Sequence, residues 1–355
     1  MPRKALWAKL SLTLCSGPET VKHRKFLRLN TAACLLAVVV LLSTPAGAEP
    51  LRIAYTSIGI IYEGLWIAQA AGLFNKHNIQ AELLYIGGGP PSTQALIAGD
   101  VQISFTAAGA VVAANLAGSD VILLGATVDT LPFEIWSIPT IKTPEQLKGT
   151  KMGVSRFGAT TDFVAHYVVK KWGLKVGQDI SLIQAGAGPE VFTALKAGAV
   201  QSGVMSTGPY TVQAEKDGFF RLADVSTMGI PYAFGPFAAR RSWVREHQDL
   251  VGRFMKAYIE GIYRFKTDKR LALATLEKYA RIKTTPATEQ IYEAYAKRYF
   301  KRAPEVTNEA LQTSLDELSA SRPLPPGTTP QRFADNSFVR ALVESGFVDS
   351  LYSVR

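Results

Sequence analysis

In the segment LRIAYTSIGIIYEGLWIAQAAGLFNKHNIQAELLYI, residues 51–86, the residue pattern predicts one strand, one helix and a second strand. Residues 51–55 form a short apolar strand that ends in the polar turn Thr56-Ser57. Apolar residues then recur at helical spacing from Tyr62 to Phe74, and residues 79–86 alternate as a strand does. A strand, a helix and a strand in this order predict parallel pairing in an α/β layer.

The same alternation continues along the chain in two runs. The predicted strands cover 101–105, 121–128, 151–154, 180–184 and 202–205, with helices between them. After the break at Gly87–Pro91, Ser92 or Thr93 is expected to cap the next helix. From Arg240 onward the pattern is mainly helical. With 355 residues, the chain is long enough for two lobes.

Residues 1–48 have the three parts of a secretory signal. A basic stretch at 22–28 precedes an apolar run from Ala32 to Leu42, and small residues follow up to Ala48. The apolar run is shorter than a membrane span. We therefore expect export with cleavage after Ala48. Two alternatives stay open, an N-terminal membrane anchor and a start of translation near Val21.

The charge of the chain is concentrated in this segment. The formal net charge is +10, but seven of the 39 Lys and Arg residues and one of the 29 acids lie in residues 1–48. The remainder carries about +4 and has no long basic block, which argues against a nucleic-acid partner.

The exported part has few groups suited to catalysis or metal binding. Both cysteines, Cys15 and Cys34, lie within residues 1–48. His77, His166 and His247 are scattered and lack metal-ligand spacing, and no known nucleophile or phosphate-loop motif occurs. We predict no catalytic residue, no metal site and no cofactor.

Four segments in order along the chain resemble a known family. They are GLWIAQAAGLFNKHNI at 64–79, QALIAGDV at 94–101, LKGTKMGV at 147–154 and ALKAGAVQSG at 194–203. In them the chain resembles the nitrate/sulfonate/taurine-type solute-binding proteins of ABC transporters, a group that also covers binders of thiamine-pyrimidine precursors. It departs from the family at Gln201-Ser202, where an Asp is frequent; we interpret this position as structural.

The resemblance implies a type II periplasmic-binding-protein fold. Each of two lobes would be a mixed α/β sheet flanked by helices, with a C-terminal helical extension. Lobe 1 would comprise residues 49–135 and 236–355, and lobe 2 residues 136–235. The resemblance further implies a periplasmic monomer that binds a small molecule between its lobes and delivers it to the permease subunits of an ABC importer.

Polar or glycine-rich turns follow several predicted strands and open the next helix. Helix N-termini offer free N–H groups and partial positive charge, and open α/β sheets bind ligands at the carboxyl ends of their strands. We predict the ligand-binding residues to be Thr56, Ser57, Tyr62, Gly88, Gly89, Thr106, Ala107, Arg156, Phe157, Gly158, Ala159, Thr160, Ser206 and Thr207.

Arg156 is the strongest candidate, because a guanidinium pairs with a carboxylate, sulfonate or phosphate through two parallel hydrogen bonds. The alternative is a solvated arginine on a loop. These groups favour a small organic anion. Tyr62 and Phe157 keep an aromatic or heterocyclic solute open.

Two other functions remain as alternatives to transport. One is an enzyme on the same fold, like the relative that makes the thiamine pyrimidine with a cysteine-rich iron segment and a lysine-bound cofactor. The lack of cysteine after residue 48 argues against it. The other is a sensor-partner or adhesive protein that shares the binding fold.

Overall fold

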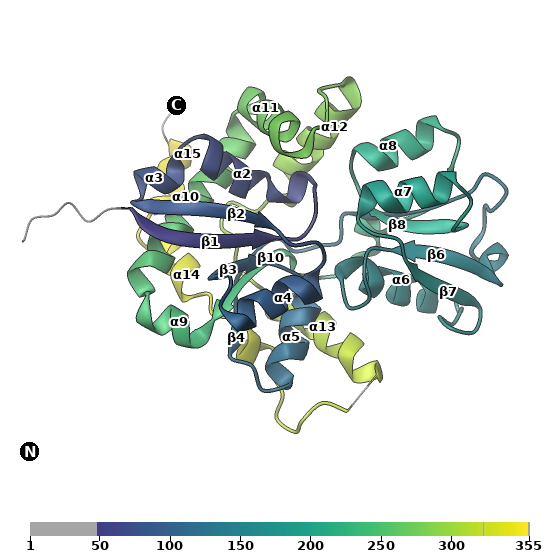
Figure 1. Ribbon diagram of the computed structural model, residues 1–355, viewed down its shortest axis with the longest axis horizontal. Helices are drawn as coiled ribbons and strands as arrows, with labels where there is room; N and C mark the ends of the chain where they lie inside the picture. Colours follow the sequence, from purple (N-terminus) through teal and green to yellow (C-terminus); the bar gives the residue numbers. More distant parts are fainter. Residues whose placement is uncertain (1–47, 322, 354–355) are drawn as a thin grey trace, which may run out of the picture. The chain divides into compact units, whose positions relative to one another are not determined.

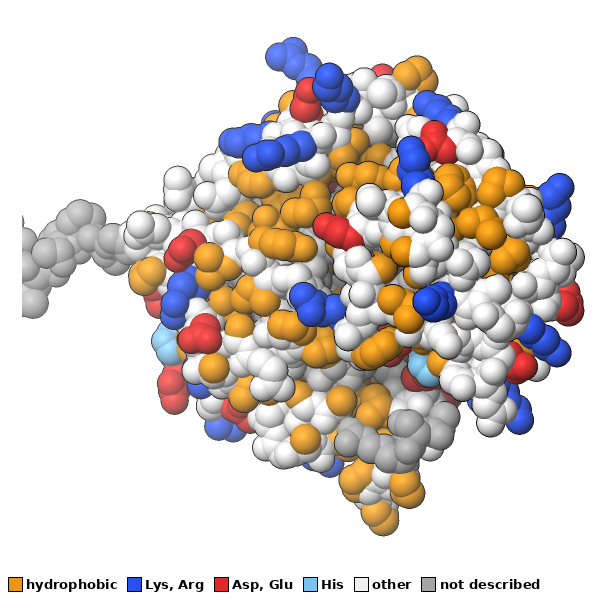
Figure 2. Space-filling view, turned by 45° about the vertical axis from the view of Figure 1, so that its right-hand side comes forward, with side chains coloured by type: hydrophobic (Ala, Val, Ile, Leu, Met, Phe, Trp, Pro, Cys, Tyr) orange, Lys and Arg blue, Asp and Glu red, His pale blue; other side chains and the backbone are white. Residues whose placement is uncertain are grey.

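The computed structural model describes residues 48–321 and 323–353, without the side chains of 320 and 321. Apart from Ala48, the predicted signal segment lies outside the described residues. Residues 48–355 form one compact unit. In the part that is described, no helix is both long and apolar enough to cross a membrane. Lys and Arg side chains are scattered among acidic ones on the face drawn in Figure 2.

Two five-stranded mixed sheets organise this unit (Figure 1). The first has the order β2-β1-β3-β10-β4 and the second the order β7-β6-β8-β5-β9. The strands are β1 (Glu49–Tyr55), β2 (Ile79–Tyr85), β3 (Ile103–Phe105), β4 (Val121–Val128), β5 (Phe133–Ser137), β6 (Thr150–Val154), β7 (Ile180–Gln184), β8 (Ser202–Ser206), β9 (Phe220–Asp224) and β10 (Phe234–Arg240). We call each sheet with its helices a lobe, lobe 1 for the first sheet and lobe 2 for the second.

The two sheets share one plan. In each, three parallel strands are followed by one strand that runs antiparallel to both of its neighbours. That strand, β5 or β10, comes directly after the chain has crossed from the other sheet. The two crossings are joined by a hydrogen bond from the Tyr232 N–H to the Asp129 carbonyl, 3.0 Å long. The predicted boundaries at 135/136 and 235/236 fall inside β5 and β10, and the exact ends of the lobes stay a prediction.

Helices cover both faces of each sheet. In Figure 1, α2, α10 and α11 lie on one face of the first sheet and α4, α5 and α13 on the other, while α7 and α8 lie opposite α6 around the second sheet. The helices and single turns are η1 (Ile60–Tyr62), α2 (Glu63–Ala70), α3 (Leu73–Lys76), α4 (Gly89–Ala98), α5 (Ala108–Leu116), η2 (Pro144–Leu147), α6 (Thr160–Lys171), α7 (Gly188–Lys196), α8 (Pro209–Lys216), η3 (Val225–Met228), α9 (Arg241–Glu246), α10 (Gln248–Thr267), α11 (Lys269–Ala280), α12 (Pro286–Ala294), η4 (Tyr295–Tyr299), α13 (Asn308–Ser321), η5 (Pro330–Phe333), α14 (Ser337–Glu344) and α15 (Phe347–Ser353).

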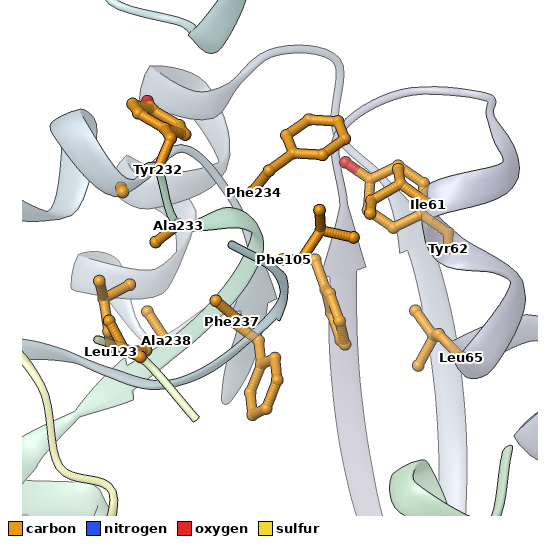
Figure 3. Close-up of a cluster of buried hydrophobic side chains, with 14 of the residues drawn as sticks. Ile61, Tyr62, Leu65, Phe105, Leu123, Tyr232, Ala233, Phe234, Phe237 and Ala238 are labelled. Carbon is orange, nitrogen blue, oxygen red and sulfur yellow. The ribbon is translucent and has the colours of Figure 1, made fainter. Parts of the chain in front are cut away.

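The core of lobe 1 extends to the end of the sheet that faces lobe 2. All eight residues of β4 are buried, as expected for a strand covered by helices on both faces. The ring centroids of Phe105 and Phe237 are 5.1 Å apart within the cluster drawn in Figure 3. Ile61, Tyr62 and Phe234 lie together at one end of this cluster. The same three residues form part of the cavity described below.

One cap was predicted wrongly. Helix α4 begins at Gly89, with Gly88 as its N-cap, so Pro90 and Pro91 lie in its first turn, where proline is tolerated. Ser92 and Thr93 are therefore inside the helix and buried. Their hydroxyls bond to the next strand and turn, Ser92 to Ser104 at 2.6 Å and Thr93 to Thr106 at 2.8 Å.

Candidate functional site

A cavity of about 260 Å³ lies between the two lobes. It is large enough for a small molecule and too small for a polymer. Both lobes contribute to its lining, which consists of Thr56, Ser57, Gly59, Ile60, Ile61, Tyr62, Tyr85, Gly87, Gly88, Gly89, Thr106, Ala107, Phe133, Ser155, Arg156, Ala159, Thr160, Thr161, Gly186, Ala187, Gly188, Glu190, Val204, Met205, Ser206, Phe234, Gly235 and Tyr295.

Four helices begin at this cavity without a side-chain cap. The N-caps of α4, α5, α6 and α7 are Gly88, Ala107, Ala159 and Ala187, and all four line the cavity. Glycine and alanine have no side-chain oxygen, whereas Ser, Thr, Asp and Asn are the usual N-caps. The N–H groups in the first turns of these helices therefore receive no side-chain cap. Helix α4 contributes only the Gly89 N–H there, because Pro90 and Pro91 have none, and Pro189 removes one from α7. The partial positive charges of the four N-termini add at one place.

Arg156 adds a full positive charge to the lobe 2 side. Its side chain is exposed and lies against the backbone of Gly88 in lobe 1. A Cβ placed on Gly88 would lie 2.4 Å from Arg156 Cδ, so only glycine allows this approach. Since Gly88 is also the N-cap of α4, the side chain of Arg156 and the N-terminus of that helix are close together. Both attract negative charge.

Glu190 supplies the opposite charge. It lies in the first turn of α7, is exposed, and lines the same cavity. Partial burial and then the charge of Glu190 raise the pKa of Tyr85, and Arg156 acts in the opposite direction. The Tyr85 hydroxyl is thus close enough to both charges for each of them to change its pKa. The cavity has an electropositive side at Arg156 and a negative group at the start of α7.

Several hydroxyl groups hold the turns in shape. Thr56 Oγ1 and the Tyr62 hydroxyl are 2.7 Å apart, and burial raises the pKa of Tyr62. Thr106 Oγ1 donates to the Gly89 carbonyl at 2.9 Å, so its proton fixes the start of α4. In lobe 2, Thr161 Oγ1 accepts from the Ser155 N–H at 2.8 Å. The turns are therefore tied internally, which keeps the helix N-termini in place.

All but three of the residues predicted from the sequence line this cavity. The exceptions are Phe157, Gly158 and Thr207. Phe157 is 51% exposed, and its N–H donates to Gln184 Oε1 at 3.0 Å. The Gly158 N–H donates to Asp162 in the first turn of α6. The Thr207 N–H donates to the Pro132 carbonyl at the crossing. Direct ligand contact by the other predicted residues stays a prediction.

Other lining residues were not in the predicted set. Phe133 and Phe234, two of the aromatics that the sequence suggests could line a cleft, stand at the starts of β5 and β10, and the centroids of their rings are 4.9 Å apart. Tyr85 ends β2, and a tyrosine two residues before the Gly87–Gly89 turn was a usable signal. Tyr295 lies some 90 residues beyond the last predicted turn, about Thr207, in a segment that the sequence marked only as helical.

The cavity has few groups able to bind a metal. Its lining contains one carboxylate and no histidine or cysteine. Among the residues that the structure describes, no group of three or more His, Cys, Asp or Glu side chains could hold a metal ion. The arrangement instead suits a ligand that accepts hydrogen bonds from N–H groups.

The comparisons with known proteins show the family of the chain. Residues 62–268 match the family model described as NMT1/THI5 like. The chain belongs to the NMT1/THI5-like family. It is 26% identical over 250 residues to a protein of Brucella abortus (strain 2308) named only as a binding protein, across 70% of this chain and 75% of that protein.

Solved structures of this fold include two binding proteins. The alkanesulfonate-binding protein SsuA from Xanthomonas axonopodis pv. citri, bound to MOPS, is 19% identical, with a TM-score of 0.67 over 81% of this chain and 99% of that one. The periplasmic nitrate-binding protein NrtA from Synechocystis PCC 6803 is 13% identical, with a TM-score of 0.65 over 84% of this chain and 89% of that one. At these identities the likeness shows the fold, which is the predicted two-lobed one.

Proposed function

We propose that the chain is the periplasmic substrate-binding component of an ABC importer and that it binds a small organic anion. The observation that supports this most is the meeting of four uncapped helix N-termini at one cavity between the lobes. Such N-termini bind anions without a buried cation, so the ligand can be released when the lobes separate. Arg156 would pair with a sulfonate or carboxylate group there.

A binding role fits the cavity better than a catalytic one. Apart from Glu190, the lining has no ordinary general base, and His77, His166 and His247 all lie outside it. Because one fold hosts both binding proteins and enzymes, this inference comes from the site and not from the fold. An aromatic or heterocyclic solute remains the second ligand class, since Tyr62, Phe133 and Phe234 form an apolar wall.

The test is a ligand screen by thermal unfolding on residues 49–355. The panel contains MOPS, alkanesulfonates, nitrate, aromatic carboxylates and pyrimidines. A ligand at a hundred times its Kd stabilises the folded state by about 2.7 kcal/mol, which is well within detection. We expect at least one sulfonate or carboxylate to raise the Tm.

Two variants give the control. Arg156→Gln should abolish most of that rise, whereas Lys171→Gln removes an equal charge from the exposed end of α6 and should leave it unchanged. If only pyrimidines or neutral aromatics stabilise the protein, the anion assignment is wrong. If cell fractionation finds the protein in the cytoplasm, the transport role is wrong.

A further inference from the structure

A short π-helical turn in lobe 1 reaches across to lobe 2. Residues Tyr295–Tyr299, labelled η4, continue directly from α12 and form the only π-helix within the described ranges 48–321 and 323–353. Such turns are rare and occur often at functional sites. Two tyrosines of this turn contact lobe 2, and one of them also forms part of the cavity wall.

Tyr295 bonds to the loop that follows β8. Its hydroxyl donates to the Thr207 carbonyl at 3.1 Å, and its side chain is fully buried. Thr207 directly follows Ser206, which lines the cavity. The Thr207 N–H donates in turn to the Pro132 carbonyl at 2.8 Å. One residue of this loop is thus tied both to lobe 1 and to a crossing.

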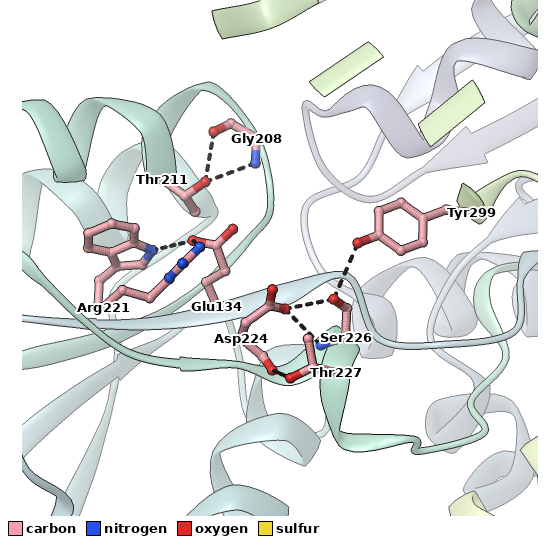
Figure 4. Close-up of polar contacts among 9 residues, drawn as sticks. Glu134, Gly208, Thr211, Arg221, Asp224, Ser226, Thr227 and Tyr299 are labelled. Carbon is pink, nitrogen blue, oxygen red and sulfur yellow. Dashed lines mark hydrogen bonds and ion pairs between the residues drawn. The ribbon is translucent and has the colours of Figure 1, made fainter. Parts of the chain in front are cut away.

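Tyr299 bonds to η3, just before the second crossing (Figure 4). Its hydroxyl donates to Ser226 Oγ at 3.2 Å, and Ser226 Oγ donates to Asp224 Oδ1 at 2.7 Å. The single Ser226 hydroxyl proton is used by the carboxylate, so Tyr299 must be the donor. The acceptor is polarised by a charge, which strengthens the bond from Tyr299.

Lobe 1 holds the π-helical turn firmly. Lys266 of α10 donates to the carbonyls of Ala296 and Phe300, and burial lowers its pKa. The ring centroid of Phe300 is 4.4 Å from that of Phe265, which lies in α10. The turn therefore moves with α10. A change in the angle between the lobes that moves the π-helical turn away from lobe 2 would stretch or break the two tyrosine bonds.

We propose that Tyr295 and Tyr299 are positioning residues that set the angle between the lobes and thereby the rate of ligand release. They form a connection that is separate from the two crossings. Tyr295 places the Ser206 loop at the cavity wall, and Tyr299 fixes the segment that leads into the second crossing. The effect on release rests on the proposed binding function; the effect on the angle does not.

The angle can be measured without any ligand. Residues 49–355 contain no cysteine, so Glu82→Cys in β2 and Lys171→Cys in α6 give one specific pair of spin labels, both at exposed positions. We expect the double variant Tyr295→Phe/Tyr299→Phe to shift the distance distribution between the labels to longer values and to broaden it. Tyr258→Phe is the matched control, because it removes a hydroxyl that bonds to Thr127 within lobe 1.

The decisive outcome is this distribution in a folded protein. A double variant with the Tm of the Tyr258→Phe control and an unchanged distribution would overturn the proposal. A double variant that fails to fold is replaced by the single variant Tyr299→Phe, whose side chain is half-buried, and the same criterion applies.

Ligand release provides the second measurement, with MOPS as the probe. The hydrogen bonds of Tyr295 and Tyr299 each join two uncharged groups. We therefore expect the off-rate of MOPS to rise by about threefold to tenfold for each hydroxyl removed. An off-rate unchanged in a variant whose angle has changed would refute the link to release. If MOPS fails to bind the parent protein, MOPS is not a ligand of the proposed site, and the distance measurement alone decides the proposal on the angle.

Discussion

The contact between Gly88 and Arg156 allows a sharp test of the site. Gly88 has φ +90 and ψ 146, a conformation that side chains of L-residues rarely adopt. In Gly88→Ala the new Cβ would lie 2.4 Å from Arg156 Cδ and 3.0 Å from its Nε, where ordinary contact begins at 3.4 Å. The distance between the new Cβ and Arg156 Cδ must therefore increase by about 1 Å, either because the Arg156 side chain rotates or because the lobes separate.

The size of the effect follows from these two terms. The backbone conformation at residue 88 costs on the order of 1–3 kcal/mol for a residue other than glycine, and this term lowers the free energy of unfolding. Displacement of the guanidinium removes a hydrogen bond to a charged group, worth about 1.5–3 kcal/mol. At about 1.4 kcal/mol per tenfold change, the affinity for an anionic ligand should fall by roughly 10- to 100-fold.

The assay is titration calorimetry with the best anionic ligand of the screen, on Gly88→Ala, Arg156→Ala and the double variant. If the clash acts through Arg156, the alanine at 88 adds little to the loss once Arg156 has been truncated. Equal losses from Gly88→Ala in both backgrounds would refute the reasoning. Chemical denaturation of the same proteins separates the stability term from the binding term.

Three further predictions address other parts of the protein. Glu190→Gln removes the one carboxylate of the cavity lining, so calorimetry should find a severalfold higher affinity for anions. Because salt screens the charge of Glu190, this gain in affinity should be smaller in 0.5 M salt. A lower affinity would instead indicate that Glu190 accepts a hydrogen bond from a donor group of the ligand. Burial raises the pKa of Glu63 well above its usual value, so its folded form holds the proton more strongly than the unfolded chain. This contribution to stability is present below about pH 4.5, the ordinary glutamate value, and is lost as the pH rises through the raised pKa. The difference in denaturant midpoint between Glu63→Gln and the parent protein should therefore be more favourable to the variant at pH 8 than at pH 5. An equal difference at both pH values would contradict this prediction. Gly261→Ala places a Cβ 2.1 Å from the Gly64 carbonyl oxygen where α10 crosses α2, and should lower the free energy of unfolding by about 1–3 kcal/mol while leaving ligand affinity unchanged in the folded fraction.

The sequence predicted the parallel parts of the fold well. Strands such as β1 and β3 are short apolar runs bounded by polar turns, and their signal is local. The antiparallel strands were harder to detect. β5 and β10 are followed by turns without glycine-rich breaks, and their pairing is between segments about 70 to 130 residues apart. Only the family resemblance supplied the crossings, since no local pattern encodes them.

The candidate site was predictable to the extent that it is made of turns. The N-cap glycine and alanines could be located because each follows a recognisable strand. Phe157 was predicted to bind the ligand because it is an aromatic residue next to a polar turn, but its side chain is exposed and does not line the cavity. Thr207 has its N–H and its carbonyl bonded to protein groups. Tyr295 could not be found, because its position depends on how the C-terminal helices pack against lobe 2.

The position of β10 in the first sheet has a consequence for folding order. β10 lies between β3 and β4, but it follows every strand of the second sheet in the chain. A nascent polypeptide that ends just before residue 234 therefore holds all the strands of lobe 2, while lobe 1 still has a gap at which β3 and β4 have no partner between them. Lobe 2 is thus the half that can mature first, and unpaired strand edges of the other half stay open to aggregation until the last crossing has been made.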